Sequence, residues 1–146
     1  MENLRILREE HNLKQEDIAN ILGIKRPTYT SYEIERDTIP INHLNTLCNY
    51  FHISVDYALG LTNKKYYKDM KEDVNKELLC YRLKELRTSN KLTQQKIAII
   101  LNTSRSAWTN YEHGRYQIPT LLLFELARKY HYSMDYLLGK IDKNML

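Results

Sequence analysis

The chain contains few of the residues that break helices or cross-link small proteins. Its 146 residues include only 4 glycines, 3 prolines and 2 cysteines. So few glycines and prolines favour helices over turn-rich strands. Cys48 and Cys80 cannot build a disulfide scaffold or a four-ligand zinc site, and neither belongs to a CxxC pair. We therefore expect a helical protein of a reducing compartment, the cytoplasm.

Long hydrophobic runs are also missing. The longest apolar run, residues 97–101, is far shorter than the roughly 18 residues that a membrane helix needs. The first ten residues are charged from position 2 onward, so we expect no secretory leader. The sequence predicts a soluble protein without a membrane segment.

The chain has only a small excess of positive charge, and this excess is unevenly distributed along the sequence. The net charge is +4, from 22 Lys and Arg against 18 Asp and Glu. Residues 1–62 carry six basic and nine acidic side chains, whereas residues 80–146 carry eleven basic and five acidic ones. The segment 63–79 has a net charge of +1. An anionic partner is therefore expected mainly for the second half of the chain.

An internal repeat organises the sequence. A shift of 79 positions aligns residues 4–62 with residues 83–141 without a gap, and 24 of the 59 pairs are identical. We therefore predict a first domain at 1–62, a linker at 63–79 and a second domain at 80–146. A domain of about 60 residues buries only about 60% of its unfolded surface, which favours further contacts between the repeats or with another chain.

Each repeat has the apolar spacing of short helices. Leu4 and Leu7 mark a first helix, and Ile18, Ile21 and Leu22 mark a second. No stretch of strand length alternates with period two, so the predicted fold class is all-α, with five helices in each repeat. In the linker, apolar residues recur every three or four positions among charged ones, which predicts an amphipathic helix that continues into the second repeat. The apolar face of this helix either packs on the repeats of its own chain or forms an interface between the repeats or with a second chain.

Local signals place the ends of several helices. Gly23 and Asn102 suit the left-handed conformation that ends the second helix of each repeat. Ser104 suits the N-cap of the third helix of the second repeat. Ser54 and Ser133 suit the same role for a short fifth helix.

The second repeat carries the sequence LTQQKIAIILNTSRSAWTNYEHGRYQIP at residues 92–119, which resembles the helix-turn-helix of the phage repressor and Cro (XRE) family. Residues 13–40 are similar, and the two repeats together cover about 118 of the 146 residues. The resemblance implies two tandem five-helix DNA-binding domains, each with its third helix in the major groove. It also implies an ion pair between the first and third helices, Arg8 with Glu33 and Arg87 with Glu112.

The family positions of the second repeat indicate DNA-contacting residues. A polar face at the start of the third helix suits a groove in which bases present donors and acceptors, while Trp108 and Tyr111 point into the core. Arg105 could bind guanine through two hydrogen bonds, and Asn110 could pair with adenine. Thr93 is the expected cap of the second helix. The predicted contacts are Gln94, Ser104, Arg105, Ser106, Thr109, Asn110 and Arg115.

The first repeat departs from this pattern. Lys25 replaces the capping serine, Pro27 is tolerated only in the first helical turn, and Glu35 stands where the second repeat has Gly114. A positive φ at Glu35 would cost on the order of 1 kcal/mol. We expect weaker DNA binding or a different half-site, unless the local basic residues suffice. The predicted contacts are Gln15, Lys25, Arg26, Thr28, Thr30, Ser31 and Arg36.

The function predicted from the sequence is sequence-specific binding of double-stranded DNA by a transcriptional repressor, as a homodimer or an intramolecular pseudo-dimer. The five histidines show no HExxH spacing, and no nucleophile motif or glycine-rich phosphate loop is visible. We therefore expect no enzyme activity, no cofactor and no small-molecule ligand. The alternative is a protein-interaction module, such as an antitoxin or anti-repressor, which the acidic first repeat favours and the second repeat opposes.

Overall fold

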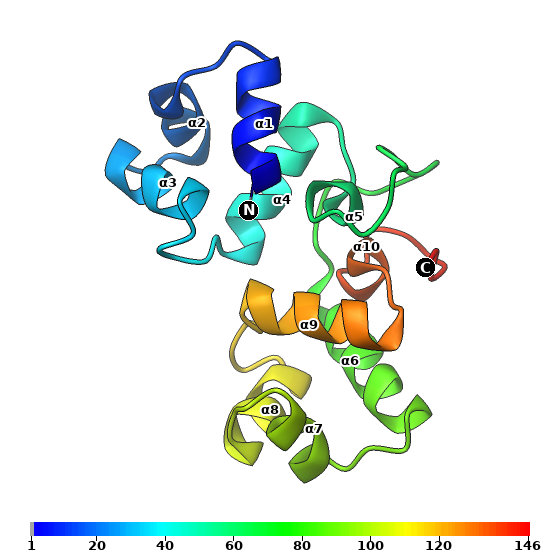
Figure 1. Cartoon of the computed structure of the whole chain (residues 1–146). Helices are drawn as coiled ribbons and strands as arrows, with labels where there is room; N and C mark the ends of the chain where they lie inside the picture. The colour runs from blue at the N-terminus through cyan, green and yellow to red at the C-terminus, as the bar shows by residue number, and fades with distance from the viewer. Residues whose placement is uncertain (1) are drawn as a thin grey trace. The chain divides into compact units, whose positions relative to one another are not determined.

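The computed structural model describes residues 2–146, with only the backbone described for Glu2. All regular secondary structure of these residues is helical (Figure 1). The chain divides into two compact units, unit 1 ending at Lys68 and unit 2 beginning at Asp69. The prediction of an all-α fold with two tandem domains is confirmed. None of the described helices is long and apolar enough to cross a membrane.

Unit 1 consists of five helices around one apolar core. They are α1 (Glu2–Glu10), α2 (Gln15–Leu22), α3 (Arg26–Glu33), α4 (Ile41–Phe51) and α5 (Val55–Ala58). Each helix contributes at least one side chain that is completely or almost completely buried, among them Leu4, Ile18, Tyr29, Leu44 and Val55. Because α3 buries Tyr29 and Tyr32, its opposite face is left at the surface.

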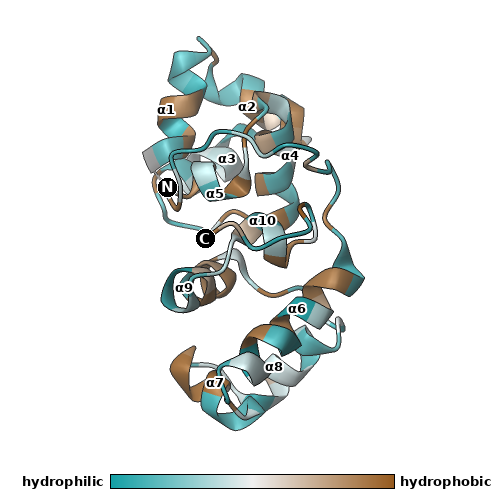
Figure 2. Cartoon of the chain, turned by 90° about the vertical axis from the view of Figure 1, so that its right-hand side faces the viewer, coloured by the Kyte–Doolittle hydropathy of each residue, from teal (hydrophilic) through white to brown (hydrophobic). Residues whose placement is uncertain are grey.

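Unit 2 repeats this arrangement with α6 (Lys76–Ser89), α7 (Gln94–Ile100), α8 (Arg105–Glu112), α9 (Thr120–Tyr130) and α10 (Met134–Leu137). Its core includes Leu83, Leu86, Ile97, Trp108 and Leu126, all completely buried. Figure 2 shows that α7 ends in hydrophobic residues, of which Ile99 remains exposed. Trp108 lies in the core as predicted, and Tyr111 is half-buried.

The predicted turn and cap signals are confirmed. Gly23 and Asn102 adopt φ values of 66° and 53° after α2 and α7. The hydroxyl of Ser104 accepts a hydrogen bond from the Ala107 amide, and that of Thr93 accepts one from the Lys96 amide. In unit 1 the capping position of α3 is Lys25, which makes no such bond, and Pro27 is tolerated in the first turn. The start of the third helix is therefore better capped in unit 2 than in unit 1.

The prediction of a helical linker is wrong for most of its length. Residues 63–75 are not helical, and α6 begins only at Lys76, where the Asn75 side chain accepts a hydrogen bond from the Leu78 amide. Two apolar residues of this non-helical segment are buried, and each belongs to a different unit. Tyr67 is buried in unit 1 and donates to Asp56 Oδ2 at 2.8 Å. Met70 is buried in unit 2.

Backbone hydrogen bonds explain this arrangement. In unit 1 the Ser54 amide donates to the Lys65 carbonyl at 2.6 Å, and in unit 2 the Lys71 amide donates to the Lys140 carbonyl at 2.9 Å. The Asn75 amide also bonds to the Leu138 carbonyl at 2.9 Å. These bonds pair main-chain groups with distant parts of each unit, so they replace the bonds that a helix would have made.

The boundary between Lys68 and Asp69 changes the distribution of charge. The lysines at 64, 65 and 68 belong to unit 1, which therefore has nine basic and nine acidic side chains and a net charge of zero. Unit 2 carries the whole net charge of +4. The acidic character predicted for the first half is thus neutralised within unit 1.

We predict that Tyr67→Phe destabilises unit 1 by about 1–3 kcal/mol, because the buried Asp56 carboxylate loses a hydrogen bond. Urea denaturation would measure the loss. Tyr50→Phe is the matched control, since the Tyr50 side chain is 53% exposed. Equal stability of the two variants would show that the hydrogen bond from Tyr67 to Asp56 does not stabilise unit 1.

Candidate nucleic-acid interface

A buried ion pair holds the first and third helices of each unit together. In unit 1 Arg8 Nε lies 2.5 Å from Glu33 Oε1, and Arg8 Nη2 lies 3.2 Å from Oε2. In unit 2 the two bonds between Arg87 and Glu112 are both 2.9 Å. The glutamate side chains are only 3% and 5% exposed. The predicted ion pairs are confirmed.

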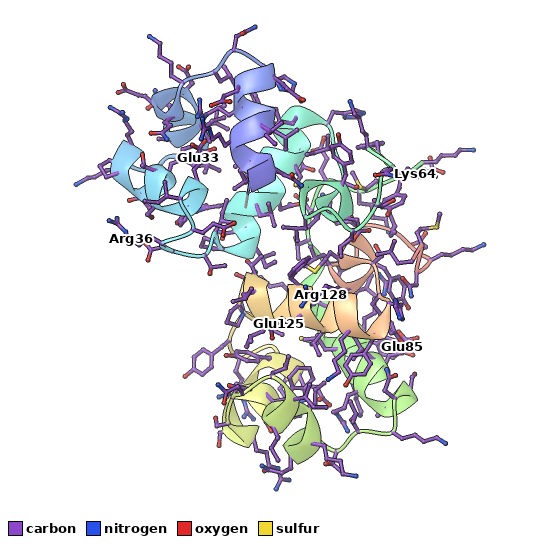
Figure 3. The ribbon with its side chains drawn as sticks, in the orientation of Figure 1. Glu33, Arg36, Lys64, Glu85, Glu125 and Arg128 are labelled. Atoms are coloured by element: carbon purple, nitrogen blue, oxygen red, sulfur yellow. The ribbon has the colours of Figure 1, made fainter. Side chains whose placement is uncertain are left out.

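The same arginines also fix the turn before the second helix. Arg8 Nη1 donates to the Leu13 carbonyl, and Arg87 Nη1 donates to the Leu92 carbonyl. Glu33 lies between α1, α2 and α3, as Figure 3 shows. One arginine and one glutamate therefore connect the three helices that present the candidate interface.

Each glutamate also accepts hydrogen bonds from other side chains of its own unit. Tyr29 donates its hydroxyl to Glu33 at 2.8 Å, and Trp108 donates its indole N–H to Glu112 at 2.6 Å. Gln15 donates its amide to Glu33 at 2.9 Å. Burial raises the pKa of both carboxyls, but the hydrogen bonds from arginine and its neighbours outweigh it. Both pKa values lie below the ordinary 4.5.

We predict that Glu112→Gln lowers the stability of unit 2 by roughly 3 kcal/mol at pH 7, because Arg87 keeps a buried charge without its partner. The lowered pKa of Glu112 means that the ion pair stabilises the fold above about pH 4.5 and is lost as the pH falls through the folded-state pKa. The difference in unfolding free energy between wild type and variant should therefore shrink below pH 4.5.

Chemical denaturation between pH 3 and pH 7 would test this pH dependence. Glu125→Gln is the control, since Glu125 lies half-buried on α9 of the same unit (Figure 3). The prediction is contradicted if Glu112→Gln costs the same at every pH, or if it changes DNA preference while leaving the melting temperature intact.

Unit 2 places its predicted residues around the start of α8. Arg105 and Ser106 are exposed in the first turn, whereas Thr109 and Asn110 are half-buried one turn later. Arg115 is exposed after the helix and donates to Asn110 Oδ1 at 3.4 Å. The remaining two, Gln94 and Ser104, stand at the start of α7 and at the N-cap of α8.

The start of α7 adjoins this surface. Thr109 donates its hydroxyl to Gln94 Oε1 at 3.4 Å, and Gln94 lines a shallow hollow together with Arg105. The hydroxyl of Ser104 accepts the capping bond of α8 and is exposed, so its O–H can still donate, and its contact with DNA stays a prediction. Lys96, which the sequence reasoning missed, is exposed on the first turn of α7 and adds a positive charge.

Unit 1 holds its equivalent residues more tightly. Thr30 donates its hydroxyl to Gln15 Oε1 at 2.8 Å, so both ends of the Gln15 amide are bonded within the unit. Arg26 and Thr28 are exposed on the first turn of α3, and Lys25 and Arg36 are exposed at either side of the helix. Figure 3 shows Arg36 just beyond α3.

Ser31 corrects the prediction for unit 1. Its side chain is 1% exposed, and its hydroxyl donates to the Thr28 carbonyl at 2.7 Å. A short side chain that is buried to this extent does not reach a base edge, and its hydroxyl bonds back to its own helix instead. Ser31 therefore stabilises α3 from the inside, whereas the aligned Asn110 has a longer side chain that remains half-buried.

The turn after the third helix has the same backbone conformation in both units but a different residue at its left-handed position. Glu35 has φ 59° and Gly114 has φ 74°, so both adopt the left-handed conformation. A Cβ atom on Gly114 would lie 2.9 Å from Cys80 Sγ, so any other residue there would force the Cys80 side chain to shift. Glu35 bears the cost of about 1 kcal/mol that a non-glycine residue has in this region.

Matched positions around the candidate interface carry different charge in the two units. Unit 1 exposes or half-exposes four basic and four acidic side chains there: Lys14, Lys25, Arg26 and Arg36 with Glu16, Asp17, Glu35 and Asp37. The aligned positions of unit 2 have three basic side chains and no acidic one: Lys96, Arg105 and Arg115. The electrostatic attraction for an anion is therefore concentrated on unit 2.

The fold, with a short second helix and an exposed third helix in each unit, defines the helix-turn-helix class. Comparison with known proteins agrees: residues 4–57 match a family model described as helix-turn-helix, and residues 80–143 match one described as a helix-turn-helix domain. The chain belongs to the helix-turn-helix family, with two domains of the XRE type.

Two relatives come from Bacillus subtilis (strain 168), and both are called uncharacterized HTH-type transcriptional regulators. YobD is 38% identical over 79 residues, which cover 51% of this chain and 70% of YobD. YqaE is 38% identical over 69 residues, which cover 47% of this chain and 60% of YqaE. A solved structure is also similar, the crystal structure of a transcriptional regulator from Listeria innocua. The two sequences are 26% identical, and the alignment covers 80% of this chain and 94% of the Listeria chain with a TM-score of 0.40.

Proposed function

We propose that this protein is a transcriptional repressor that binds specific sequences of double-stranded DNA. The observation that carries the proposal is the exposed, basic first turn of α8, which stands on a helix-turn-helix frame. The names of the two Bacillus relatives, HTH-type transcriptional regulators, support the same function. In this proposal α3 and α8 are the recognition helices.

The proposed contacts follow from side-chain chemistry. The major groove admits an α-helix, and Arg105 at the start of α8 has the forked donors that match the O6 and N7 acceptors of guanine. Arg115 and Lys96 flank the helix and suit phosphate oxygens, which fix the protein on the duplex without specifying a sequence. Bound in this way, the protein excludes other proteins from the same DNA, and we therefore favour repression.

Unit 2 is the stronger DNA-binding unit in this proposal. Its matched interface positions carry a net charge of +3, whereas those of unit 1 cancel to zero. Glu35 and Asp37 of unit 1 lie beside Arg36, where phosphates are expected to pass. Each neutralised phosphate contributes to affinity through counterion release, so the unit with fewer net cations binds more weakly.

We predict that Arg105→Ala weakens binding by about 1–3 kcal/mol and relaxes the preference at one base pair. Arg26→Ala should weaken it less, because unit 1 contributes less to the affinity. Fluorescence anisotropy with genomic fragments would measure both variants at two salt concentrations. The logarithm of the wild-type binding constant should fall linearly with the logarithm of the salt concentration.

Lys143→Ala serves as the charge control, since Lys143 is exposed in the segment after α10. Figure 1 shows the C-terminus of that segment away from α8 in the same unit. Equal affinity and specificity of Arg105→Ala and Lys143→Ala would show that α8 does not contact bases. If even the wild type retains no duplex DNA at low salt, the proposal fails, and a protein-interaction module becomes the better explanation.

A further inference from the structure

The two recognition helices share one long base-contacting side chain. Arg26 and Arg105 are the first residues of α3 and α8, and both are exposed. Thr30 and Thr109 are also aligned, but each donates its hydroxyl to the glutamine at the start of the preceding helix. The shared chemistry that can reach a base is therefore one arginine, whose commonest specific partner is guanine.

The next two positions differ in what they offer to a base. Pro27 and Ser106 are aligned and exposed, but proline offers only methylene groups, whereas serine offers a hydroxyl. Thr28 is exposed, and the aligned Ala107 is half-buried. Unit 1 thus presents apolar carbon beside Arg26, which suits the C5-methyl group of thymine.

The last position differs most. Asn110 is half-buried beside Arg115, which donates to its Oδ1 atom. An amide oxygen has two lone pairs, so this bond still leaves one acceptor site on Oδ1 for the N6 amino group of adenine. The aligned Ser31 is buried and bonded to the Thr28 carbonyl. An adenine contact of this kind is therefore available only to unit 2.

On this basis we infer that the DNA target of this chain is bipartite and non-palindromic, with two different half-sites that share a guanine. This inference rests on the proposed function. The half-site of unit 1 combines the guanine of Arg26 with a thymine methyl group beside Pro27 and Thr28. The half-site of unit 2 combines the guanine of Arg105 with an adenine at Asn110. Two copies of one helix-turn-helix unit would instead select two identical half-sites.

Selection of bound duplexes from a random pool by the full chain tests this inference. The expected result is two dissimilar sequence elements, each containing a guanine. Arg26→Ala should relax the guanine of one element only, and Arg105→Ala that of the other only. Each change should weaken binding to the selected duplex within the range of roughly 5- to 150-fold that one good bidentate base contact gives, with the smaller loss for Arg26→Ala.

Two probes separate the half-sites chemically. Asn110→Ser, which gives unit 2 the residue of unit 1, should relax the adenine in the unit 2 element and leave the other element unchanged. Replacement of thymine by deoxyuridine removes only the C5-methyl group, so it should weaken binding when placed in the unit 1 element and not when placed in the other. Thermal melting of each variant verifies that it folds.

The control for unit 1 is Lys64→Ala, since Figure 3 shows Lys64 on the side of that unit away from α3. Lys64→Ala should leave both elements unchanged. Selection of a palindrome, of two identical elements or of one element alone would overturn the inference while keeping the proposed function. Selection of no DNA at all would overturn the proposed function and the inference with it.

Discussion

The buried pairs Arg8–Glu33 and Arg87–Glu112 are the constraint on which both units depend. Each glutamate is almost completely buried, so its charge must be matched by arginine and by hydrogen bonds from neighbouring side chains. Glu33 also accepts a hydrogen bond from Tyr29, and Glu112 accepts one from Trp108. The position of the third helix is therefore set by a charge in the interior, which leaves the outer face of that helix able to vary.

The variation of that outer face distinguishes the two units. Unit 2 has a hydroxyl cap, a glycine in the turn after α8 and only basic charges at the matched positions. Unit 1 has no side-chain cap for α3, a strained Glu35 and balanced charges. One frame thus supports two surfaces that differ in charge and in local backbone strain.

The predictions from the sequence succeeded for turns and helix caps, and through the family resemblance for the ion pairs, but they failed for the linker and for Ser31. Gly23, Asn102 and Ser104 were placed correctly because a turn or a cap is set within a few positions. The helical linker was wrong because Tyr67 and Met70 have helical spacing but are buried by groups far along the chain. Ser31 was wrong because a family position does not show that its hydroxyl bonds inward. The other predicted interface residues lie around α3 and α8, and their contact with DNA stays a prediction.

Glu35 has a consequence for how this protein can change over time. Its left-handed backbone costs about 1 kcal/mol, and its side chain adds a negative charge to the interface of unit 1. A single replacement by glycine, the residue at the aligned position of unit 2, would remove the strain and the charge together. Changes that favour function often cost stability, but at this position the relief of backbone strain and the change in surface charge come from the same substitution.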